Sequence, residues 1–419
     1  MKIDLTIDHI GAGGDGVAEK DGESYFVPFS APRDVIVASS VEKRGNGTLA
    51  TLDEIKTPGP DRVPAECRHF GTCGGCALQH LSPEFTALWK RQRIIDCLSM
   101  AGVNDAEVLQ TITCPTGSRR RAEFIVSKRK KGVMIGFHLR RSHQVFDVGN
   151  CPLIDPNLMA LVKPLRAMLP ALLPRNSQAK LMATVTENGA DLLITAAKDL
   201  DLETRELLAG FASDNGISRI SLRQTSNSAP EVISARHAAE IKLGDTTVTI
   251  APGGFLQASE AGEQALAAFA CEALSNARHI ADLFAGVGSF TFALSNSARV
   301  HGVEGDEELV AALQNAANRA IRPITTEVRD LFHRPLLAAE LNAFDGLLFD
   351  PPRAGAKAQA EEIAKSDIPT IVAISCNPIT FARDVSLLIN SGYELGSVQP
   401  VDQFLWSPHI EMAAVLHRN

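Results

Sequence analysis

Short apolar runs alternate with helical segments from about residue 245 to the C-terminus, and this alternation constrains the fold more than any other feature. The apolar runs are typical of buried strands, and a strand–helix–strand order of this kind favours a parallel, doubly wound sheet. In such sheets, ligands bind in the crevice at the carboxyl ends of the strands. The residues that follow each run are therefore the first candidates for chemistry. The runs are RHIADLF, ARVHGVE, TTEVRD, FDGLLF and TIVAIS.

A glycine-containing loop, DLFAGVG, follows the first of these runs at residues 282–288. Glycine allows a tight turn and a close approach of the backbone to a ligand. A dinucleotide fingerprint would need a third glycine where Thr291 stands. The loop therefore fits a nucleotide-like ligand without a pyrophosphate better than NAD.

Acidic residues end the next two runs. Glu304 closes VHGVE, where a carboxylate can accept both hydroxyls of a ribose, and Asp330 closes TTEVRD at a place suited to an adenine amine. Together they favour an adenosyl ligand. Alternatively, each acid only caps the following helix or adds charge to its first turn, which is common for Asp and Glu.

Two further strand ends carry Asp350 and Cys376 to the same edge of the sheet. The prolines after Asp350 stiffen its turn, and the helix expected after Cys376 should lower the pKa of the thiol through its N-terminus. A thiolate that adds to C6 of uracil makes C5 nucleophilic toward an electrophilic methyl group. A general base must then remove the C5 proton, and both Glu411 and His409 are candidates.

The cysteines form a second pattern, in which Cys67, Cys73 and Cys76 share one short loop and Cys151 follows a basic segment. Neither a membrane span nor a signal peptide can be read, so we expect a cytoplasmic protein with reduced thiols. Four thiolates suit either a zinc ion or a [4Fe-4S] cluster. Three other cysteines are best interpreted as apolar core residues, namely Cys97, Cys114 and Cys271.

The length of 419 residues predicts two or three domains. Residues 1–58 consist of short alternating runs with glycine-rich turns, which predicts a small β-barrel. Residues 59–240 mix strand-like and helical runs, which predicts an α+β domain, and residues 241–419 hold the parallel sheet. A helix is expected over residues 83–100, with Ser82 as its N-cap.

The net charge of −8 argues against a nucleic-acid partner, but the distribution of charge argues for one. Between Arg119 and Arg141 stand nine lysine and arginine residues and one acid, Glu123. Such a local field suits the phosphates of RNA, although many charge runs are only solvated faces.

These motifs, in this order, resemble those of the TrmA-like RNA (uracil-5-)-methyltransferases, and most closely the RlmD type that acts on 23S ribosomal RNA. The resemblance covers nearly the whole chain, through CRHFGTCGGCALQHLSPEF, PGGFLQAS, DLFAGVGSF, FDPPRAG, SCNPITFARD and PHIEMAAVL. It implies a multidomain α/β protein with an OB-like N-terminal TRAM barrel, which binds RNA. A central α+β domain with an iron–sulfur cluster and a C-terminal Rossmann-like class I methyltransferase domain would follow.

The resemblance also implies roles for individual residues. The expected contacts of S-adenosylmethionine are Gln257, Phe284, Glu304 and Asp350, to which the strand-end argument adds Gly286 and Asp330. The [4Fe-4S] ligands would be Cys67, Cys73, Cys76 and Cys151. Cys376 would be the nucleophile and Glu411 the base, and the segment GSRRRAEF would bring Arg119 and Arg121 near RNA.

Other functions stay open. The same chemistry could serve transfer RNA or another ribosomal uridine, although the barrel and the cluster together favour ribosomal RNA. An RNA-binding iron–sulfur sensor without catalysis is a second alternative, against which Cys376 and Glu411 argue. DNA cytosine methyltransferases also use a cysteine, but theirs follows a proline rather than preceding Asn-Pro. In every case the target base must leave its stack to reach the thiol.

Overall fold

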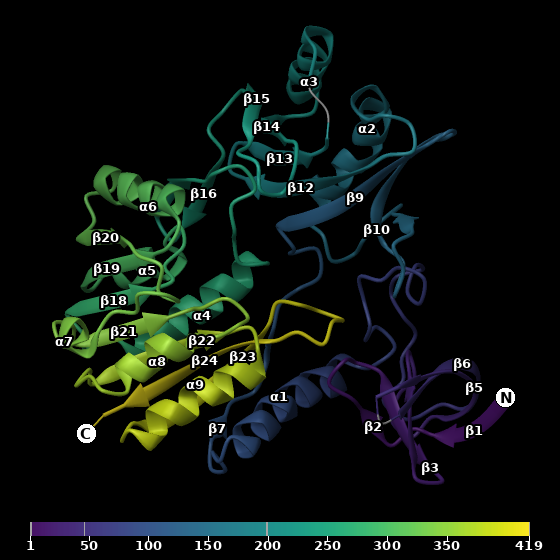
Figure 1. Ribbon diagram of the computed structural model, residues 1–419, viewed down its shortest axis with the longest axis horizontal. Coiled ribbons are helices and arrows are strands. Elements are labelled where there is room, and N and C mark those ends of the chain that lie inside the picture. The colour runs from purple at the N-terminus through teal and green to yellow at the C-terminus, as the bar shows by residue number, and fades with distance from the viewer. Residues whose placement is uncertain (1, 46, 198–199, 419) are drawn as a thin grey trace.

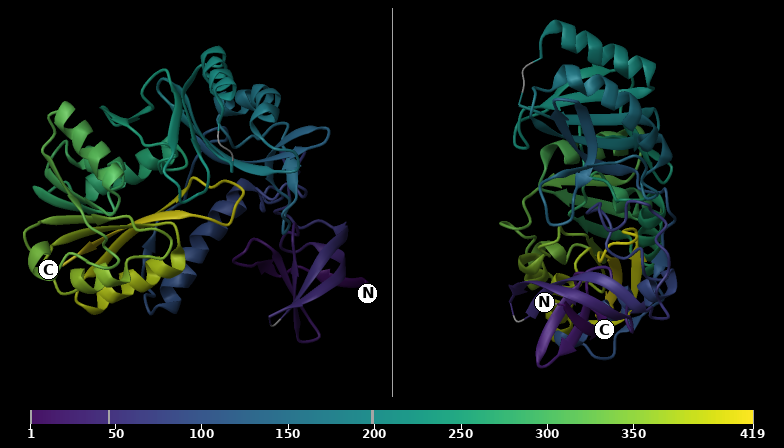
Figure 2. Two further views of the ribbon diagram at one scale, coloured as in Figure 1. Left: turned by 45° about the horizontal axis from the view of Figure 1, so that its top comes forward. Right: turned by 90° about the vertical axis from the view of Figure 1, so that its right-hand side faces the viewer.

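The computed structural model describes residues 2–45, 47–197 and 200–418 (Figure 1). Strands gather into sheets of six, seven and nine strands along the chain, with a two-stranded ribbon between the last two. Figure 2 shows the N-terminal sheet to one side of the two larger sheets. Within the described ranges, none of the helices has the length and apolar character needed to cross a membrane.

The N-terminal sheet has the strand order β1-β5-β6-β4-β3-β2. Side chains alternate between the two faces of these strands, and the inward-facing aliphatic ones, including Leu5, Val27 and Ile36, form a buried cluster. The strands are β1 (Lys2–Thr6), β2 (His9–Ile10), β3 (Gly16–Lys20), β4 (Glu23–Val27), β5 (Val35–Arg44) and β6 (Gly47–Thr57).

The central sheet has the order β11-β10-β9-β12-β13-β14-β15, and α2 (Pro156–Leu172) and α3 (Leu202–Asp214) pack against it. The apolar faces of these helices and of the sheet form one hydrophobic core. The strands are β9 (Arg121–Arg129), β10 (Gly132–His138), β11 (Val145–Asp147), β12 (Gln178–Thr186), β13 (Gly189–Thr195), β14 (Ile217–Arg223) and β15 (Glu231–Ala235). The ribbon that follows pairs β16 (Glu240–Leu243) with β17 (Thr246–Thr249).

The C-terminal sheet contains the predicted parallel strands in the order β20-β19-β18-β21-β22. They are β18 (His279–Leu283), β19 (Arg299–Glu304), β20 (Ile324–Val328), β21 (Gly346–Phe349) and β22 (Thr370–Ser375). The helices among them are α4 (Glu260–Ala273), α5 (Ser289–Leu294), α6 (Glu307–Arg319), α7 (Ala338–Leu341), α8 (Lys357–Ile363) and α9 (Pro378–Asn390). The parallel part of the sheet is therefore confirmed.

The last strand departs from the predicted parallel arrangement, because it runs antiparallel to both of its neighbours in the sheet. β24 (Glu411–His417) lies antiparallel between β22 and β23 (Glu394–Asp402). Ser375, the last residue of β22, is paired with Met412 near the start of β24. This reversal brings the beginning of β24 to the carboxyl edge of the parallel strands.

The predicted helix over residues 83–100 is confirmed as α1 (Pro83–Met100), and the Ser82 hydroxyl accepts a hydrogen bond from the backbone N–H of Phe85 at 3.2 Å. Although α1 precedes the central sheet, it lies beside α9 (Figure 1). The short strands β7 (Glu107–Val108) and β8 (Ile112–Thr113) likewise pair with β23. A buried ion pair between Lys90 and Asp402, at 2.6 Å, ties α1 to the end of β23.

Candidate active site

A cavity of about 410 Å³ opens at the carboxyl edge of the C-terminal sheet. The ends of β18, β19, β21 and β22 and the start of β24 meet there. All eight residues that the sequence predicts for catalysis and cofactor binding line this one cavity. They are Gln257, Phe284, Gly286, Glu304, Asp330, Asp350, Cys376 and Glu411.

The Glu304 carboxylate is held in place by backbone N–H groups on two sides. Its Oε2 accepts from Gly286 N at 3.1 Å, and its Oε1 accepts from Gly305 N at 2.6 Å and Asp306 N at 3.0 Å. Gly286 has a φ of 56°, in the left-handed region that glycine adopts without strain. Phe284 has a φ of 63°, which is costly for a residue with a side chain. The loop is thus shaped to present a fixed carboxylate to the cavity.

Asp330 lies in a more open part of the cavity, with 52% of its side chain exposed. Its carboxylate accepts from the backbone N–H of Phe332 at 2.9 Å and pairs with Nδ1 of His333 at 2.7 Å. The hydrogen bond from His333 lowers the pKa of Asp330. The rings of Phe332 and Phe284 lie 5.4 Å apart, so two aromatic side chains stand beside this acid.

Asp350 sits deeper in the cavity, where burial raises the pKa of its carboxyl to about 7. Gln257 Nε2 donates to Asp350 Oδ2 at 3.1 Å, and this hydrogen bond lowers the pKa in opposition to burial. Gln257 is itself buried and receives a hydrogen bond from Gln403 Nε2 at 2.7 Å. Gln257 and Asp350, both predicted to contact the cofactor, are therefore linked directly by a hydrogen bond from the Gln257 amide.

Cys376 follows the last residue of β22 and faces the same cavity as Glu411, which begins β24. Burial, followed by the charges of Glu411 and Asp350, raises the pKa of the Cys376 thiol to about 11. The nearby charge of Arg353 lowers it by less. The predicted lowering of this pKa is wrong, because burial and two carboxylates outweigh the N-terminus of α9.

The two candidates for the base occupy different positions. Glu411 is 5% exposed and lines the cavity, and burial followed by the charge of Asp350 raises its pKa well above the ordinary value. His409 is an exposed residue whose Nδ1 lies 3.4 Å from an Arg353 nitrogen, and it does not line the cavity. Its place in the cavity wall therefore favours Glu411 over His409 as the base.

Several residues that line the cavity were not predicted as site residues from the sequence, among them Phe255, Phe332 and Arg353. Arg353 directly follows the Asp-Pro-Pro turn, and this proximity was a usable signal. Phe255 is 62% exposed, which is unusual for a large apolar side chain and marks a surface available for contact.

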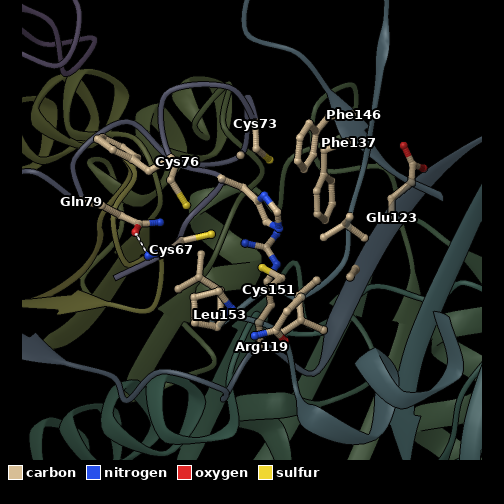
Figure 3. A pocket seen from close by; sticks show the side chains of 18 residues that line it. Cys67, Cys73, Cys76, Gln79, Arg119, Glu123, Phe137, Phe146, Cys151 and Leu153 are labelled. Atoms are coloured by element: carbon tan, nitrogen blue, oxygen red, sulfur yellow. Dashed lines mark hydrogen bonds between the residues drawn. The ribbon is translucent and has the colours of Figure 1, made fainter. Parts of the chain in front are cut away.

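A second cavity, of about 280 Å³, is lined by the four predicted metal ligands, Cys67, Cys73, Cys76 and Cys151 (Figure 3). Burial, followed by charge on the neighbouring thiols, raises the pKa of Cys73 and Cys151, and it raises that of Cys76 to about 12. All four are free thiols. Across the described residues, no three His, Cys, Asp or Glu side chains form a group that could hold a metal ion as they stand.

The three cysteines interpreted as core residues are buried or half-buried, and each packs in a hydrophobic cluster of the C-terminal sheet. They are Cys97, Cys114 and Cys271.

The basic segment contacts the protein itself more than the sequence suggested. Arg119 lines the cysteine cavity and its Nε donates to the carbonyl of Arg121 at 3.2 Å. Arg121 lies over the ring of Phe255, with 5.8 Å between guanidinium carbon and ring centroid.

Internal ion pairs also occupy three further arginines: Arg120 with Glu263, and Arg140 and Arg141 with Asp15. The turn between β9 and β10 keeps exposed charge at Arg129, Lys130 and Lys131.

Comparison with known proteins places this geometry in a family. The family described as tRNA (uracil-5-)-methyltransferase matches residues 238–419. An uncharacterized RNA methyltransferase of Brucella suis is 40% identical over 98% of this chain and 97% of its own. The 23S rRNA (uracil(1939)-C(5))-methyltransferase RlmD of Shewanella sediminis is 31% identical over 99% of this chain and 95% of its own.

A solved structure extends the likeness to the fold of nearly the whole chain. The Pyrococcus abyssi tRNA (uracil-54, C5)-methyltransferase, crystallized with S-adenosyl-L-homocysteine, is similar with a TM-score of 0.76 at 21% sequence identity. The match covers 99% of this chain and 100% of the other. The chain therefore belongs to the family of RNA (uracil-5-)-methyltransferases.

Proposed function

We propose that the protein transfers the methyl group of S-adenosylmethionine to C5 of a uridine in 23S ribosomal RNA through a covalent adduct between Cys376 and C6. The product is 5-methyluridine. The observation that carries the proposal is the single cavity that joins a cysteine, a buried carboxylate and an adenosyl-type set of residues. The S-adenosyl-L-homocysteine in the Pyrococcus abyssi enzyme supports S-adenosylmethionine as the methyl donor.

The methyl donor binds along the strand ends. Glu304 accepts hydrogen bonds from the ribose hydroxyls, because three backbone N–H groups fix its carboxylate beside the glycine loop. Asp330 accepts from the adenine amine, with Phe284 and Phe332 beside the ring. Gln257 and Asp350 then face the methionine part of the donor, and the charge of Asp350 acts on Cys376.

In the reaction, Cys376 adds as a thiolate to C6 of the uracil, which turns the ring into an enolate. Its C5 attacks the methyl carbon, the bond from sulfur to methyl breaks, and the sulfonium becomes a neutral thioether. Glu411 then takes the C5 proton, and the bond between C6 and the Cys376 sulfur breaks with the electron pair returning to sulfur. The charge of Arg353 lowers the pKa of Cys376. It therefore favours the thiolate both when the sulfur attacks C6 and when the sulfur leaves C6 at the end of the reaction.

Replacing Glu304 with glutamine should weaken the binding of S-adenosyl-L-homocysteine by roughly tenfold to a hundredfold. The amide keeps the volume but turns an N–H toward backbone donors and loses the charge that the ribose hydroxyls meet. Isothermal titration calorimetry measures the affinity, and Glu308→Gln on the exposed face of α6 is the control. Equal affinity in Glu304→Gln and the control would contradict the assigned role.

The ribosomal target rests on the similarity to RlmD over nearly the full length of both chains. The Pyrococcus abyssi enzyme, whose fold is also shared over the full length, acts on transfer RNA. Transfer RNA is therefore the alternative substrate. The test incubates the protein with methyl-labelled S-adenosylmethionine and either unmodified 23S ribosomal RNA or unmodified transfer RNA, followed by nucleoside analysis. Label in 5-methyluridine from ribosomal RNA alone supports the proposal, whereas label from transfer RNA alone overturns the choice of target.

The cysteine cavity suits a [4Fe-4S] cluster, to which Cys67, Cys73, Cys76 and Cys151 would be the ligands. The donor set has the right chemistry, since four thiols surround one cavity of about 280 Å³. Burial, and then charge on the neighbouring thiols, raises the pKa of Cys73, Cys76 and Cys151, and a cationic iron–sulfur core would offset both effects by stabilising the thiolates. When bound, the cluster supplies cross-links between the loop of Cys67 to Cys76 and the segment of Cys151.

A Cys76→Ser variant should lose most of its bound iron and sulfide and unfold at a temperature lower by several degrees, because a ligand that stabilises the fold is lost. Elemental analysis after anaerobic purification and thermal melting measure both effects. Cys97→Ser, which changes a half-buried cysteine outside the cavity, is the matched control. Stoichiometric zinc in the wild type, instead of iron and sulfide, would refute the cluster while leaving the ligand set intact.

We also propose that the three sequence units have separate tasks. Residues 1–58 form an RNA-binding TRAM module, residues 59–240 hold the cluster and guide RNA, and residues 241–419 carry out methyl transfer. The exposed charges at Arg129, Lys130 and Lys131 support RNA contact by the second unit. The packing of α1, β7 and β8 on the C-terminal sheet couples the second unit to the third.

A further inference from the structure

Gln403 lies just behind the active-site cavity, next to Gln257 of the proposed donor site and to Glu411, the proposed base. It follows β23 directly, is 6% exposed, and does not line the cavity. Its Nε2 donates to Gln257 Oε1 at 2.7 Å, and its side chain lies close enough to Glu411 to lower the pKa of that carboxyl in opposition to burial. Gln257 Nε2 continues the chain to Asp350 at 3.1 Å. One buried amide thus contacts both a cofactor-site residue and the carboxylate at the start of β24.

The orientation of the Gln403 amide is determined by a backbone donor. Its Oε1 accepts from the backbone N–H of Ser259 at 3.2 Å, so its NH₂ group must face Gln257 and Glu411. Ser259 is the N-cap of α4, and the third residue of that helix is Gly262. In a capping box, the side chain at this third position accepts from the N-cap N–H. Glycine cannot do so, and Gln403, which directly follows β23, supplies the acceptor instead.

Gly262 also makes room for this arrangement. A Cβ atom at Gly262 would lie 2.9 Å from Gln403 Cβ and 3.0 Å from Gln403 Oε1. Glycine inside a helix is less favourable than alanine, so its presence in the first turn of α4 carries a cost in stability. Gln403 makes the closest approach to this position, and the Ser259 hydroxyl, at 3.0 Å from the added Cβ, also limits the space there.

We propose that Gln403 is a positioning residue for methyl transfer, which holds Gln257 and Glu411 in one hydrogen-bonded arrangement that spans the methyl-donor site and the proton acceptor. The inference rests on the proposed function, because it assigns Gln403 to the reaction through the roles of Gln257 and Glu411. An amide donor favours the charged carboxylate, so Gln403 keeps Glu411 available as a base despite its burial. The ionizable groups that face Glu411 are Asp350, Arg353 and Cys376.

The test compares Gln403→Met and Gly262→Ala with the control Gln399→Met. Methionine matches the length of glutamine without its hydrogen bonds, and Gln399 lies on β23 with its amide donating outside the active site, to Gln110 O at 2.8 Å. Gly262→Ala displaces the Gln403 side chain while introducing a better helix former. Calorimetry with S-adenosyl-L-homocysteine measures the donor site, and kcat for methyl transfer to RNA is measured across pH.

In Gln403→Met and Gly262→Ala we expect a roughly fivefold to tenfold weaker affinity for S-adenosyl-L-homocysteine. The acidic limb of the kcat profile should also shift to higher pH by about one unit, because Glu411 loses a hydrogen-bond donor that lowers its pKa. Unchanged affinity and an unchanged limb in Gln403→Met would overturn the proposal, as would a loss of kcat that is equal at every pH. If the wild type methylates no RNA, the proposed function fails, and the calorimetry alone then decides whether Gln403 orders Gln257.

Discussion

Replacing Cys376 with alanine should lower the rate of methyl transfer to RNA by about 10⁴-fold or more. Uracil C5 is a poor nucleophile until a thiolate has added to C6, and the cavity offers one thiol for that step among its lining residues. The binding of S-adenosyl-L-homocysteine should be nearly unchanged, because the contacts proposed for the donor come from other residues. Single-turnover assays with methyl-labelled donor measure the rate, and calorimetry measures the binding.

Cys271→Ala is the matched control for this variant. Cys271 is half-buried in the core beside the same sheet and does not line the cavity, so its loss removes a thiol without touching the chemistry. Full activity in Cys271→Ala and none in Cys376→Ala is the expected pair of results. A Cys376→Ala variant that retained more than about 1% of wild-type activity would exclude an obligatory covalent adduct.

The residues that end parallel strands could be predicted from the sequence. Glu304, Asp350 and Cys376 each follow an apolar run, and the carboxyl ends of parallel strands share one edge. The helix over residues 83–100 was also predictable, because its signals are local: a serine N-cap and a proline in the first turn. Local pattern and parallel topology together account for most of the cavity.

Features that depend on distant partners could not be predicted in the same way. Glu411 meets Cys376 because β24 runs antiparallel beside β22, and no local pattern specifies that pairing. Arg120 is neutralised by Glu263, a residue 143 positions away, so counting charges over a segment overestimated its free basic surface. The pKa of Cys376 depended on burial and on two carboxylates from other strands, which outweighed the helix N-terminus considered from sequence.

Replacing Glu411 with glutamine should stop turnover after methyl transfer and trap the RNA on Cys376. The amide cannot accept the C5 proton, so the bond between C6 and sulfur cannot break, and multiple-turnover rates should fall by about 10²- to 10⁴-fold. Denaturing electrophoresis should show a protein–RNA adduct that carries one labelled methyl group per protein. This outcome separates Glu411 from residues that only bind substrate, since loss of binding would prevent the adduct.

Two controls define the trapped species. Glu394→Gln changes an exposed glutamate at the start of β23 and should turn over normally without adduct. The double variant Cys376→Ala/Glu411→Gln should form no adduct, because the attacking sulfur is gone. If Glu411→Gln turned over at the wild-type rate, another group would have to be the base, and His409 would be the next candidate to replace.

The pH dependence of adduct formation tests how Glu411 acts on the thiol. The Glu411 charge raises the pKa of Cys376, so the neutral glutamine should lower that pKa and increase the thiolate fraction near neutral pH. Adduct formation in Glu411→Gln should therefore extend to lower pH than in the wild type. The difference should disappear below the raised pKa of Glu411, where the wild-type carboxyl is already neutral. Rapid-quench measurements across pH would show this shift, whereas slower adduct formation in the variant at every pH would mean that Glu411 deprotonates Cys376 itself.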